Sequence, residues 1–386
     1  MFLPRLPKSK NCEPCEPEKL FAMEKFVNII LKPILGDFVS TVSVVILDNE
    51  QMDTIRNSVT SFRPLKRLSK NIYTPYALVM SDHCFLAEDD VKYPMIAVEI
   101  KPKQGFRSQQ SNNNGQSCNF CTKQNYLSKT GKDGGLKSKY CPLDLFSGNS
   151  RRMERAIESL MEIPKNNLRI YMDGSLLHDE NTTETKKCDA MIKEIFQSVS
   201  TFRRILIEIL KSTSSSGELS KNCHNQGNNW KIETKVLSTR EKKSCHDDEE
   251  TLPKNCILDR ILRLQTCSTS DIEAEKLVKN MTLLGIQQEE IQKIVSGDDR
   301  MLKDFSDEAT ENILKLQKYC MSVTAKDISI ILTISQKDVK DESEDSSQII
   351  VNDKSFRYKL SIIDLDPKSL NKIPHYIENK RLWSSI

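Results

Sequence analysis

The hydrophobic positions of the N-terminal third change from a helical spacing to a strand-like one. Apolar side chains recur every three or four positions over 18–31, which predicts a helix, and Pro33 breaks the pattern. The runs TVSVVIL (41–47), TPYALVM (74–80) and MIAVEIK (95–101) are β-branched or continuously apolar. Each of these three runs predicts a strand.

Helical spacing dominates the middle of the chain. Asn149 is a plausible N-cap for a helix that Pro164 ends, and NNLRIYMDG (166–174) predicts a strand that enters an Asp-Gly turn. One long amphipathic helix is expected along the apolar stripe of 191–209, and helical patterns return over 256–320.

Two strand-like runs close the chain, DISIILTIS (327–335) and RYKLSIIDLD (357–366). Polar stretches over 107–117, 211–255 and 336–353 have too few apolar residues to offset the entropy of ordering, so we expect disordered inserts there. With strands early, helices in the middle and a strand pair late, the predicted fold class is α+β.

Composition narrows the classes of protein that the chain can represent. Its 386 residues allow two or three domains, and 38% apolar with 29% charged residues is typical of a soluble globular protein. A net charge of +3 gives little support to a basic RNA-binding module, the weakest of the functions considered. The sequence lacks a run of ~18 apolar residues and a secretory signal, which predicts a cytoplasmic or nuclear protein. Twelve cysteines in such a compartment are expected to be thiols.

The segment VEIKPKQGF (98–106) places charges at the end of an apolar strand. Side chains two residues apart share a face of a strand, so Glu99, Lys101 and Lys103 can project together. One carboxylate and two ammonium groups suit a nucleotide, whose ribose needs an acceptor and whose phosphates need cations. A solvated strand edge with ordinary lysines is the alternative.

The two C-terminal strands each carry an acid at one end, Asp327 and Asp364. Two such acids on paired strands can hold Mg²⁺, and one of them can accept a proton from an attacking hydroxyl. Acids at strand ends are also common without any metal. Lys368 adds a cation four residues after Asp364.

The spacing of the cysteines also suggests a zinc site. Cys118 and Cys121 form a CxxC pair, and Cys141 follows, but a fourth ligand would have to come from elsewhere. Cys12 and Cys15 form another CxxC pair without an obvious partner pair. The sequence contains no Walker A loop, nucleophile elbow or HExxH helix, and only five histidines, so triad and histidine-rich metal chemistry are not expected.

Taken in order, VEIKPKQGF, YCPLDLFSGN, NNLRIYMDG, TAKDISIIL and IIDLD resemble the inositol-pentakisphosphate 2-kinase family. The resemblance implies a two-lobed inositol-kinase or protein-kinase-like fold, with a partial N-lobe and hinge over 1–92 and a larger C-lobe over 93–386. It also implies transfer of the γ-phosphate of ATP, with Mg²⁺, to the 2-hydroxyl of inositol 1,3,4,5,6-pentakisphosphate, giving inositol hexakisphosphate. From the resemblance we also expect a monomer that binds neither nucleic acid nor a membrane.

The same resemblance assigns roles to single residues. Asp327 corresponds to the catalytic base and Lys101 to a further catalytic residue, while Asp327 and Asp364 would hold Mg²⁺. The implied nucleotide-binding residues are Arg5, Ser81, His83, Glu99, Lys101 and Asp364. The implied contacts to the inositol phosphate are Arg67, Lys103, Lys129, Asn166, Asn167, Arg169, Lys368 and Tyr376.

Two departures from the family pattern qualify these expectations. The glycine-rich loop of the family, of the kind GEGN, has no counterpart, so we expect a chain truncated at its N-terminus. Asn119, Lys123 and Leu127 stand where the family has Arg, His and Lys, and Lys123 or Lys129 is the candidate substitute for the missing contacts. The alternative function is therefore a truncated, catalytically weak protein that binds inositol polyphosphates.

Overall fold

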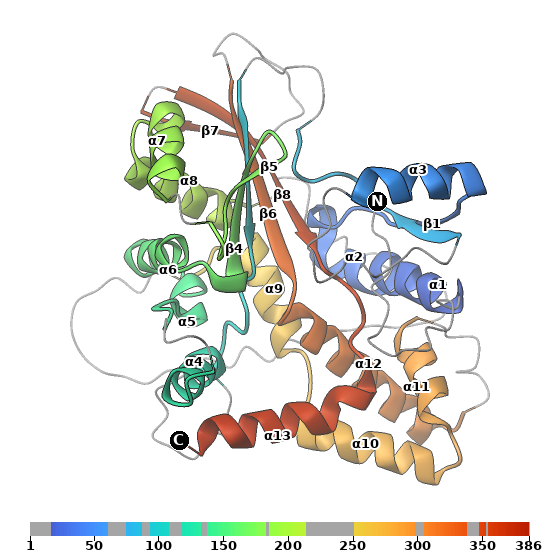
Figure 1. Ribbon diagram of the computed structural model, residues 1–386. Coiled ribbons are helices and arrows are strands. Elements are labelled where there is room, and N and C mark those ends of the chain that lie inside the picture. Colours follow the sequence, from blue (N-terminus) through green and yellow to red (C-terminus); the bar gives the residue numbers. More distant parts are fainter. Residues whose placement is uncertain are drawn as a thin grey trace.

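A computed structural model of the chain describes residues 17–60, 75–86, 93–107, 118–132, 137–182, 185–213, 251–297, 305–337, 347–352 and 354–385. Two predicted ligand contacts, Arg5 and Arg67, lie outside these ranges. The described part combines helices with antiparallel sheets, which confirms the α+β prediction (Figure 1).

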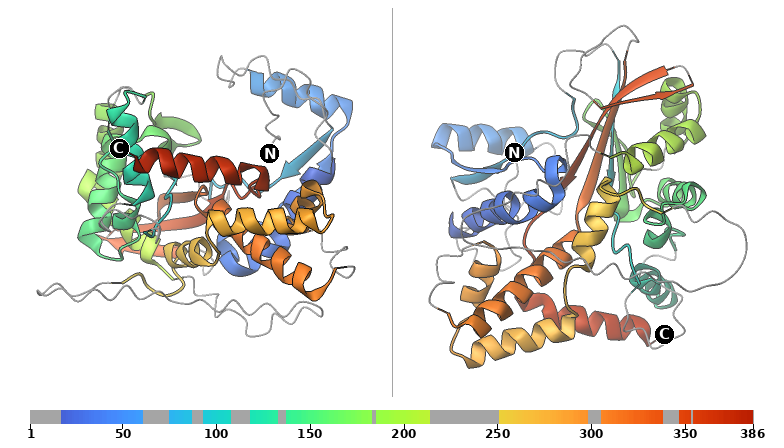
Figure 2. Two further views of the ribbon diagram at one scale, coloured as in Figure 1. Left: turned by 90° about the horizontal axis from the view of Figure 1, so that it is seen from below. Right: turned by 180° about the vertical axis from the view of Figure 1, so that it is seen from behind.

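A six-stranded antiparallel sheet forms the centre of the molecule, in the order β5-β4-β3-β6-β8-β7. Its strands are β3 (Met95–Ile100), β4 (Leu168–Met172), β5 (Ser175–His178), β6 (Ser329–Lys337), β7 (Ser347–Val351) and β8 (Lys354–Ile363). All six residues of β3 are buried, because helices lie on both sides of the sheet (Figures 1 and 2). A continuous apolar run is what such a doubly covered strand requires.

A smaller unit precedes this sheet in the chain. It pairs β1 (Ser43–Ile46) with β2 (Tyr76–Val79), both predicted as strands. Its helical elements are α1 (Pro17–Lys25), η1 (Phe26–Leu31), α2 (Lys32–Leu35), η2 (Gly36–Phe38) and α3 (Asn49–Thr60). Leu47, Met52 and Ala77 form a small core under α3 that is separate from the main one.

The helix predicted after Asn149 is α6 (Ser150–Glu162), and the Asn149 side chain accepts a hydrogen bond from the Arg152 N–H, which confirms the cap. The single long helix predicted along 191–209 is wrong. Two helices, α7 (Thr185–Phe196) and α8 (Val199–Lys211), occupy this region. Gln197 has a φ of 69°, a left-handed conformation that ends α7, and Ser198 then caps α8 through the Thr201 N–H.

The predicted helical region of 256–320 contains α9 (Ile257–Thr266), α10 (Asp271–Leu283), α11 (Gln288–Val295) and α12 (Asp307–Ala325). Further helical elements are α4 (Asn119–Lys129), α5 (Pro142–Leu145), η4 (Lys165–Asn167), η6 (Leu370–Lys372) and α13 (Ile373–Ser384). Helix α13 was not predicted. It packs between α4 and α10 at the end of the sheet where β3 and β8 finish (Figures 1 and 2).

The predicted insert at 336–353 is wrong in part. Residues 347–351 form β7, which pairs with β8, and β6 extends to Lys337. The segment SQIIV is rich in β-branched residues, and Ile349 packs against the main core, so it gains enough from pairing and burial to be ordered. The predicted inserts at 107–117 and 211–255 fall mostly outside the described residues, although Thr213 bridges to Cys256 at one end.

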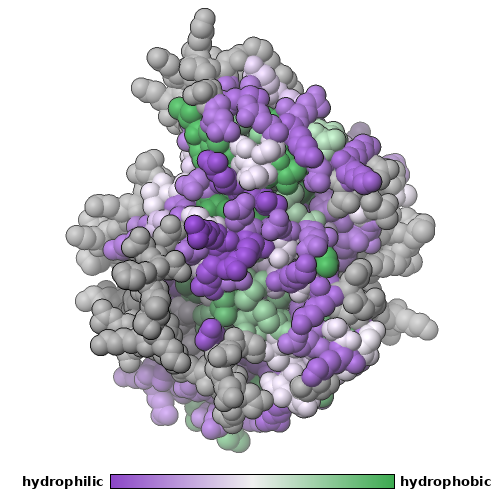
Figure 3. All heavy atoms as spheres, turned by 90° about the vertical axis from the view of Figure 1, so that its left-hand side faces the viewer, coloured by the Kyte–Doolittle hydropathy of each residue, from purple (hydrophilic) through white to green (hydrophobic). Residues whose placement is uncertain are grey.

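Two further features concern the apolar character of the helices and of one face of the molecule. In the parts of the chain that the structure describes, no helix has the length and apolar character that crossing a membrane requires. The face that carries α4 to α7 is mainly hydrophilic, with small apolar areas between the polar side chains (Figure 3).

Candidate functional site

Three strand ends meet at one edge of the central sheet. Strand β6 runs antiparallel to both β3 and β8, with Ile100 opposite Ile330 and Ser329 opposite Ile363. The residues that follow β3 and β8 therefore lie beside those that precede β6. This topology brings Lys101, Asp327 and Asp364 to the same edge.

The first cluster at this edge surrounds Lys101. Its Nζ lies 2.5 Å from Asp364 Oδ2 and 4.0 Å from Glu99 Oε1. The Ser329 hydroxyl lies 2.9 Å from Glu99 Oε1 and 3.0 Å from Asp364 Oδ2, and it can donate its one hydrogen to either carboxylate. Arg169 binds the other Glu99 oxygen at 3.0 Å. Glu99 is only 8% exposed, so these cations compensate a charge that would be costly to bury alone.

The second cluster surrounds Asp327. Lys103 Nζ lies 3.0 Å from Asp327 Oδ1, and Lys368 Nζ lies 3.1 Å from Oδ2. Burial by itself would raise the pKa of the Asp327 carboxyl, but the two ammonium groups outweigh it and lower the pKa to about 2. Burial raises the pKa of the Tyr376 hydroxyl to about 12, and the neighbouring Asp327 charge adds to that effect. Asp327, Lys103, Lys368 and Tyr376 were all predicted from the sequence.

Backbone strain marks both clusters. Lys103 has a φ of 61° and Asp364 a φ of 62°, values that residues other than glycine rarely adopt. Residues held in such conformations tend to gather at functional sites, where the surrounding structure fixes them. The two strained residues carry the side chains that pair with Asp327 and Lys101, respectively.

The NNLR segment lies against the end of β3. The Lys101 N–H donates to the Asn167 carbonyl at 2.9 Å. Arg169 extends from β4, directly opposite Glu99, and its second terminal nitrogen donates to Asn166 Oδ1 at 3.0 Å. Asn167 is itself buried. The predicted substrate clamp is therefore continuous with the Lys101 cluster.

The predicted hinge lies between β2 and β3 and contains the predicted nucleotide contacts Ser81 and His83. Ser81 is exposed, whereas His83 is only 4% exposed. One ring nitrogen of His83, Nε2, lies 3.2 Å from Ser40 Oγ, and its carbonyl accepts from Thr333 Oγ1 at 2.5 Å. Burial lowers the pKa of His83, and the Lys359 charge lowers it further. The His83 side chain therefore holds the hinge to the segment before β1, and the His83 carbonyl holds it to β6 of the sheet.

An apolar recess opens between the N-terminal unit and the end of β8. Its walls come from α1, η1, the segment before β1, β2 with the residue after it, and β8 with the residues that follow it. They are Met23, Val27, Ser40, Val42, Leu78, Met80, Ile362, Ile363, Asp364, Leu365 and Asp366. Asp364 belongs both to this recess and to the Lys101 cluster. The space between the walls is about 20 Å³, room for roughly one water, so a planar ring could enter only if the walls moved apart.

The comparisons with known proteins identify the family. A sequence model of the inositol-pentakisphosphate 2-kinase family matches residues 3–381. The chain belongs to this family. Inositol-pentakisphosphate 2-kinase of Danio rerio is 27% identical over 385 residues, which cover 90% of this chain and 79% of the relative. The Arabidopsis thaliana enzyme of that name is 25% identical over 381 residues, covering 93% and 76%. Inositol-pentakisphosphate 2-kinase IPK1 of Oryza sativa subsp. indica is 28% identical over 326 residues, covering 78% and 62%.

For a member of the inositol-pentakisphosphate 2-kinase family, the site has suitable groups for ATP and Mg²⁺. Asp327 and Asp364 present carboxylate oxygens at one edge, and Ser329 places a hydroxyl beside Asp364. Mg²⁺ prefers one or two carboxylates together with phosphate oxygens and water. Lys101 is close enough to balance phosphate charge next to Asp364.

Helix α4 also carries Lys123, which stands where the family has a His. Its Nζ lies 5.4 Å from the centre of the Trp383 ring of α13. Burial lowers the pKa of Lys123, the nearby Lys103 charge lowers it further, and Asp327 opposes them, so Lys123 lies within range of the charges of the Asp327 cluster. The predicted contact Lys129 lies six residues later on the same helix, about 240° further round its axis, on another face.

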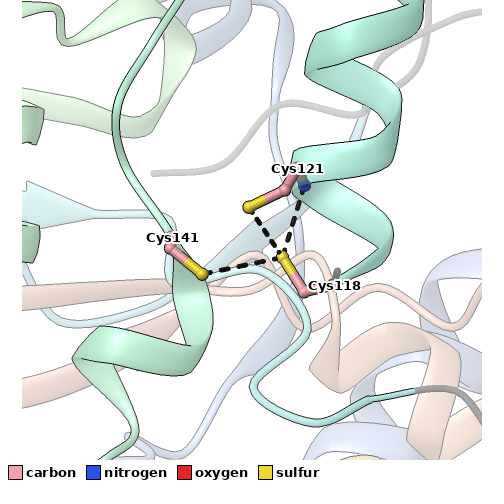
Figure 4. A group of neighbouring side chains, drawn as sticks. All are labelled: Cys118, Cys121 and Cys141. Atoms are coloured by element: carbon pink, nitrogen blue, oxygen red, sulfur yellow. Dashed lines mark hydrogen bonds between the residues drawn. The ribbon is translucent and has the colours of Figure 1, made fainter. Parts of the chain in front are cut away.

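The three cysteines of the predicted metal site come together where α4 and α5 begin. Cys118 Sγ lies 3.1 Å from Cys121 Sγ and 3.8 Å from Cys141 Sγ. Figure 4 shows the three sulfur atoms turned toward one another. The neighbouring thiols lower the pKa of Cys141, so Cys141 is the thiol of the three that loses its proton most readily. Among the described residues, no fourth Cys, His, Asp or Glu joins this group. Cys118, Cys121 and Cys141, called the cysteine trio below, offer three ligands to a thiophilic metal. Their contacts also join the start of α4 to the start of α5.

Proposed function

We propose that this chain transfers the γ-phosphate of ATP to the 2-hydroxyl of inositol 1,3,4,5,6-pentakisphosphate and releases inositol hexakisphosphate. The observation that carries this proposal is the pair of clusters at one sheet edge. One is centred on Lys101 and Asp364, and the other is centred on Asp327, with Lys103 and Lys368 around it. Phosphoryl transfer needs this combination of acids and cations, because catalysis is largely positioning and charge stabilisation.

The nucleotide is assigned to the first cluster. The adenine ring would enter between the apolar walls of the recess, which would have to move apart to admit it, and its phosphates would extend toward Asp364. Lys101 would balance the charge that develops on the transferred phosphoryl group, while Asp364 helps to hold Mg²⁺. When bound, Mg²⁺ supplies further neutralisation of the phosphate oxygens.

The inositol phosphate is assigned to the second cluster. Its five phosphates need several cations, and Lys103, Lys368 and Lys123 approach Asp327 from three different elements. Arg169 adds a planar guanidinium whose forked donors match phosphate oxygens. Tyr376 lies on α13 close enough for Asp327 to affect its hydroxyl.

Asp327 would act as the base for the 2-hydroxyl. A carboxyl whose pKa is about 2 is a weak base. When the substrate phosphates attract Lys103 and Lys368, Asp327 loses the two charges that lower its pKa. Substrate binding would therefore raise its pKa and make it a better proton acceptor in the complex that reacts.

A timed assay of the purified full chain tests the proposal. Wild type and Asp327→Asn are incubated with Mg²⁺, ATP and inositol 1,3,4,5,6-pentakisphosphate, and inositol hexakisphosphate is measured by chromatography. We expect product from wild type and a loss of about 10²- to 10⁴-fold in kcat for Asp327→Asn, the range for a general base. Asp53→Asn is the control, because it removes a carboxylate from the exposed helix α3.

Unchanged product formation by Asp327→Asn would refute the role of this residue. Binding of the inositol phosphate by wild type without any product would instead support the binding-only alternative, which the family assignment does not favour. A monomeric state and a cytoplasmic and nuclear location stay predictions.

A further inference from the structure

One buried amide links the loop after β3 to the C-terminal end of α12. Gln265, the last residue but one of α9, is 1% exposed. Its Nε2 group donates to the Lys103 carbonyl at 2.8 Å and to the Ala325 carbonyl at 2.9 Å. Its Oε1 accepts from the Gly105 N–H at 2.8 Å.

These partners fix the orientation of the amide. Two carbonyls can be satisfied only by the NH₂ group, and one N–H only by the oxygen, so the reverse orientation would leave all three contacts without a hydrogen bond. The three hydrogen bonds therefore make the amide a fixed point between the loop and the helix. The Ser322 hydroxyl of α12 donates to the Gln265 backbone carbonyl at 2.5 Å, a separate contact that does not involve the amide.

The groups that it holds belong to the Asp327 cluster. Lys103 is bound through its own carbonyl, and Asp327 follows Ala325 by two residues. The Lys103 and Asp327 side chains meet at 3.0 Å. Lys103 has a φ of 61°, a conformation that persists only where neighbouring groups determine it. Gln265 supplies two of those restraints, on either side of residue 104.

We propose that Gln265 is a positioning residue for phosphoryl transfer. It holds the 103–105 loop against the end of α12, so that Lys103 faces Asp327 before the inositol phosphate arrives. The proposal rests on the proposed function, in which Lys103 binds substrate phosphate and Asp327 is the base. Gln265 contacts neither substrate nor metal and acts only through Lys103 and Asp327.

Replacement by leucine separates positioning from packing. Gln265→Leu keeps a side chain of similar size but leaves one N–H and two carbonyls without a partner. Ser322→Ala is the matched control, because it also removes a hydrogen bond between α9 and α12 but leaves the amide contacts in place. Thermal unfolding of both variants first establishes that they fold.

Hydrogen–deuterium exchange of the full-length protein gives a readout that needs no catalysis. In Gln265→Leu we expect faster exchange in the peptide that spans 101–107, because the Gly105 N–H loses its acceptor. Ser322→Ala should leave exchange in that peptide unchanged. Equal exchange in wild type and Gln265→Leu would overturn the proposal.

A double-mutant cycle with Lys103→Met tests whether Gln265 acts through Lys103. The dissociation constant for inositol 1,3,4,5,6-pentakisphosphate is measured by calorimetry, and kcat by product formation. Alone, Gln265→Leu should weaken binding several-fold and lower kcat by about 10- to 100-fold, the cost of a misplaced group. In the Lys103→Met background the same change should alter the dissociation constant less than twofold.

Additive effects in the cycle would mean that Gln265 is structural only, and would refute the proposal. Exchange and binding do not depend on turnover. If wild type binds the inositol phosphate but forms no product, the kinase function fails while the positioning role is still decided by these two measurements.

Discussion

At the scale of single residues, Asp327 shows how the site changes with its occupant. Its side chain is 52% exposed, yet Lys103 and Lys368 hold its pKa at about 2, well below the ordinary value of 3.8. In the proposed mechanism, the lysines neutralise the acid in the free protein and would turn to the phosphates when substrate binds. The same two contacts would therefore protect Asp327 from protonation in the free protein and release it in the complex.

We predict that Lys103→Met raises the pKa of Asp327. Because the folded pKa of about 2 lies below 3.8, Asp327 contributes stability above pH 3.8 that is lost as the pH falls toward 2. With one cation removed, less of that stability exists, and the acidic limb of kcat/KM moves to higher pH. Rate profiles and unfolding curves between pH 2 and pH 6 measure both effects.

Lys139→Met is the control, because Lys139 pairs with Glu162 on the surface, away from the site. An acidic limb at the same pH in wild type and Lys103→Met would show that Lys103 does not set the protonation of Asp327.

The sequence predicted which charged residues of one strand lie together, but it did not reveal Ser329 or Gln265. Glu99, Lys101 and Lys103 alternate along one strand, so their shared face followed from the period of a strand. Ser329 also lies in a strand, but it is an ordinary polar residue in a β-branched run. Nothing in its local sequence shows that it lies between Glu99 and Asp364. Gln265 is equally ordinary in a helix, since its partners lie about 60 and 160 residues away along the chain.

At the scale of elements, the junction of α4 and α5 has its own chemistry. Three thiols lie within 4.8 Å of one another, and the backbone N–H of Cys121 also donates to Cys118 Sγ. The neighbouring thiols lower the pKa of Cys141, which favours the thiolate, the form in which cysteine binds metal. Helix α4 also carries Lys123.

We predict that the trio binds one Zn²⁺ per chain, with a fourth ligand from water or from a residue outside those described. Cys118→Ser should lose the metal and lower the unfolding temperature, because a structural metal contributes directly to folding. Metal content by mass spectrometry of the purified protein, together with thermal unfolding, provides the measurement.

Cys188→Ser is the matched control, since Cys188 is equally buried but lies on α7, away from the trio. Wild type that contains no metal after purification with added Zn²⁺ would contradict the prediction. Equal metal content in Cys118→Ser and wild type would do so as well.

Prediction at this scale failed where a short-range feature interrupted a longer pattern. The apolar stripe of 191–209 continues across the α7–α8 break, so hydrophobic periodicity alone does not reveal it. The left-handed Gln197 and the cap at Ser198 determine that break, and serine caps are common enough to be ambiguous. Strand β7 was missed because an acidic stretch precedes it and dominates the local composition.

At the scale of the whole molecule, the two ligands would meet at the same sheet edge from different sides. The nucleotide recess takes its walls from the N-terminal unit and from the end of β8. The cations of the substrate cluster come instead from the loop after β3, from α4, and from the segment between β8 and α13. The sequence could not reveal the recess, because its residues are apolar, far apart along the chain, and typical of any core. It becomes visible only when the sheet order is known.

This division predicts that one substitution can weaken nucleotide binding without affecting the other ligand. Val42 is buried in the wall of the recess, so Val42→Phe should fill the space assigned to adenine. We expect the dissociation constant for ATP to rise by about tenfold or more, because a larger side chain cannot be accommodated in packed walls without strain. Binding of inositol pentakisphosphate should stay within twofold of wild type, which would also show that the variant is folded. Ile46→Phe, at a position 70% exposed on β1, four residues after Val42, adds a similar group outside the recess and should change neither constant. Calorimetric titrations with each ligand decide the matter: if ATP binds Val42→Phe as tightly as wild type, the adenine lies elsewhere, and the nucleotide phosphates must then reach Asp364 from another direction.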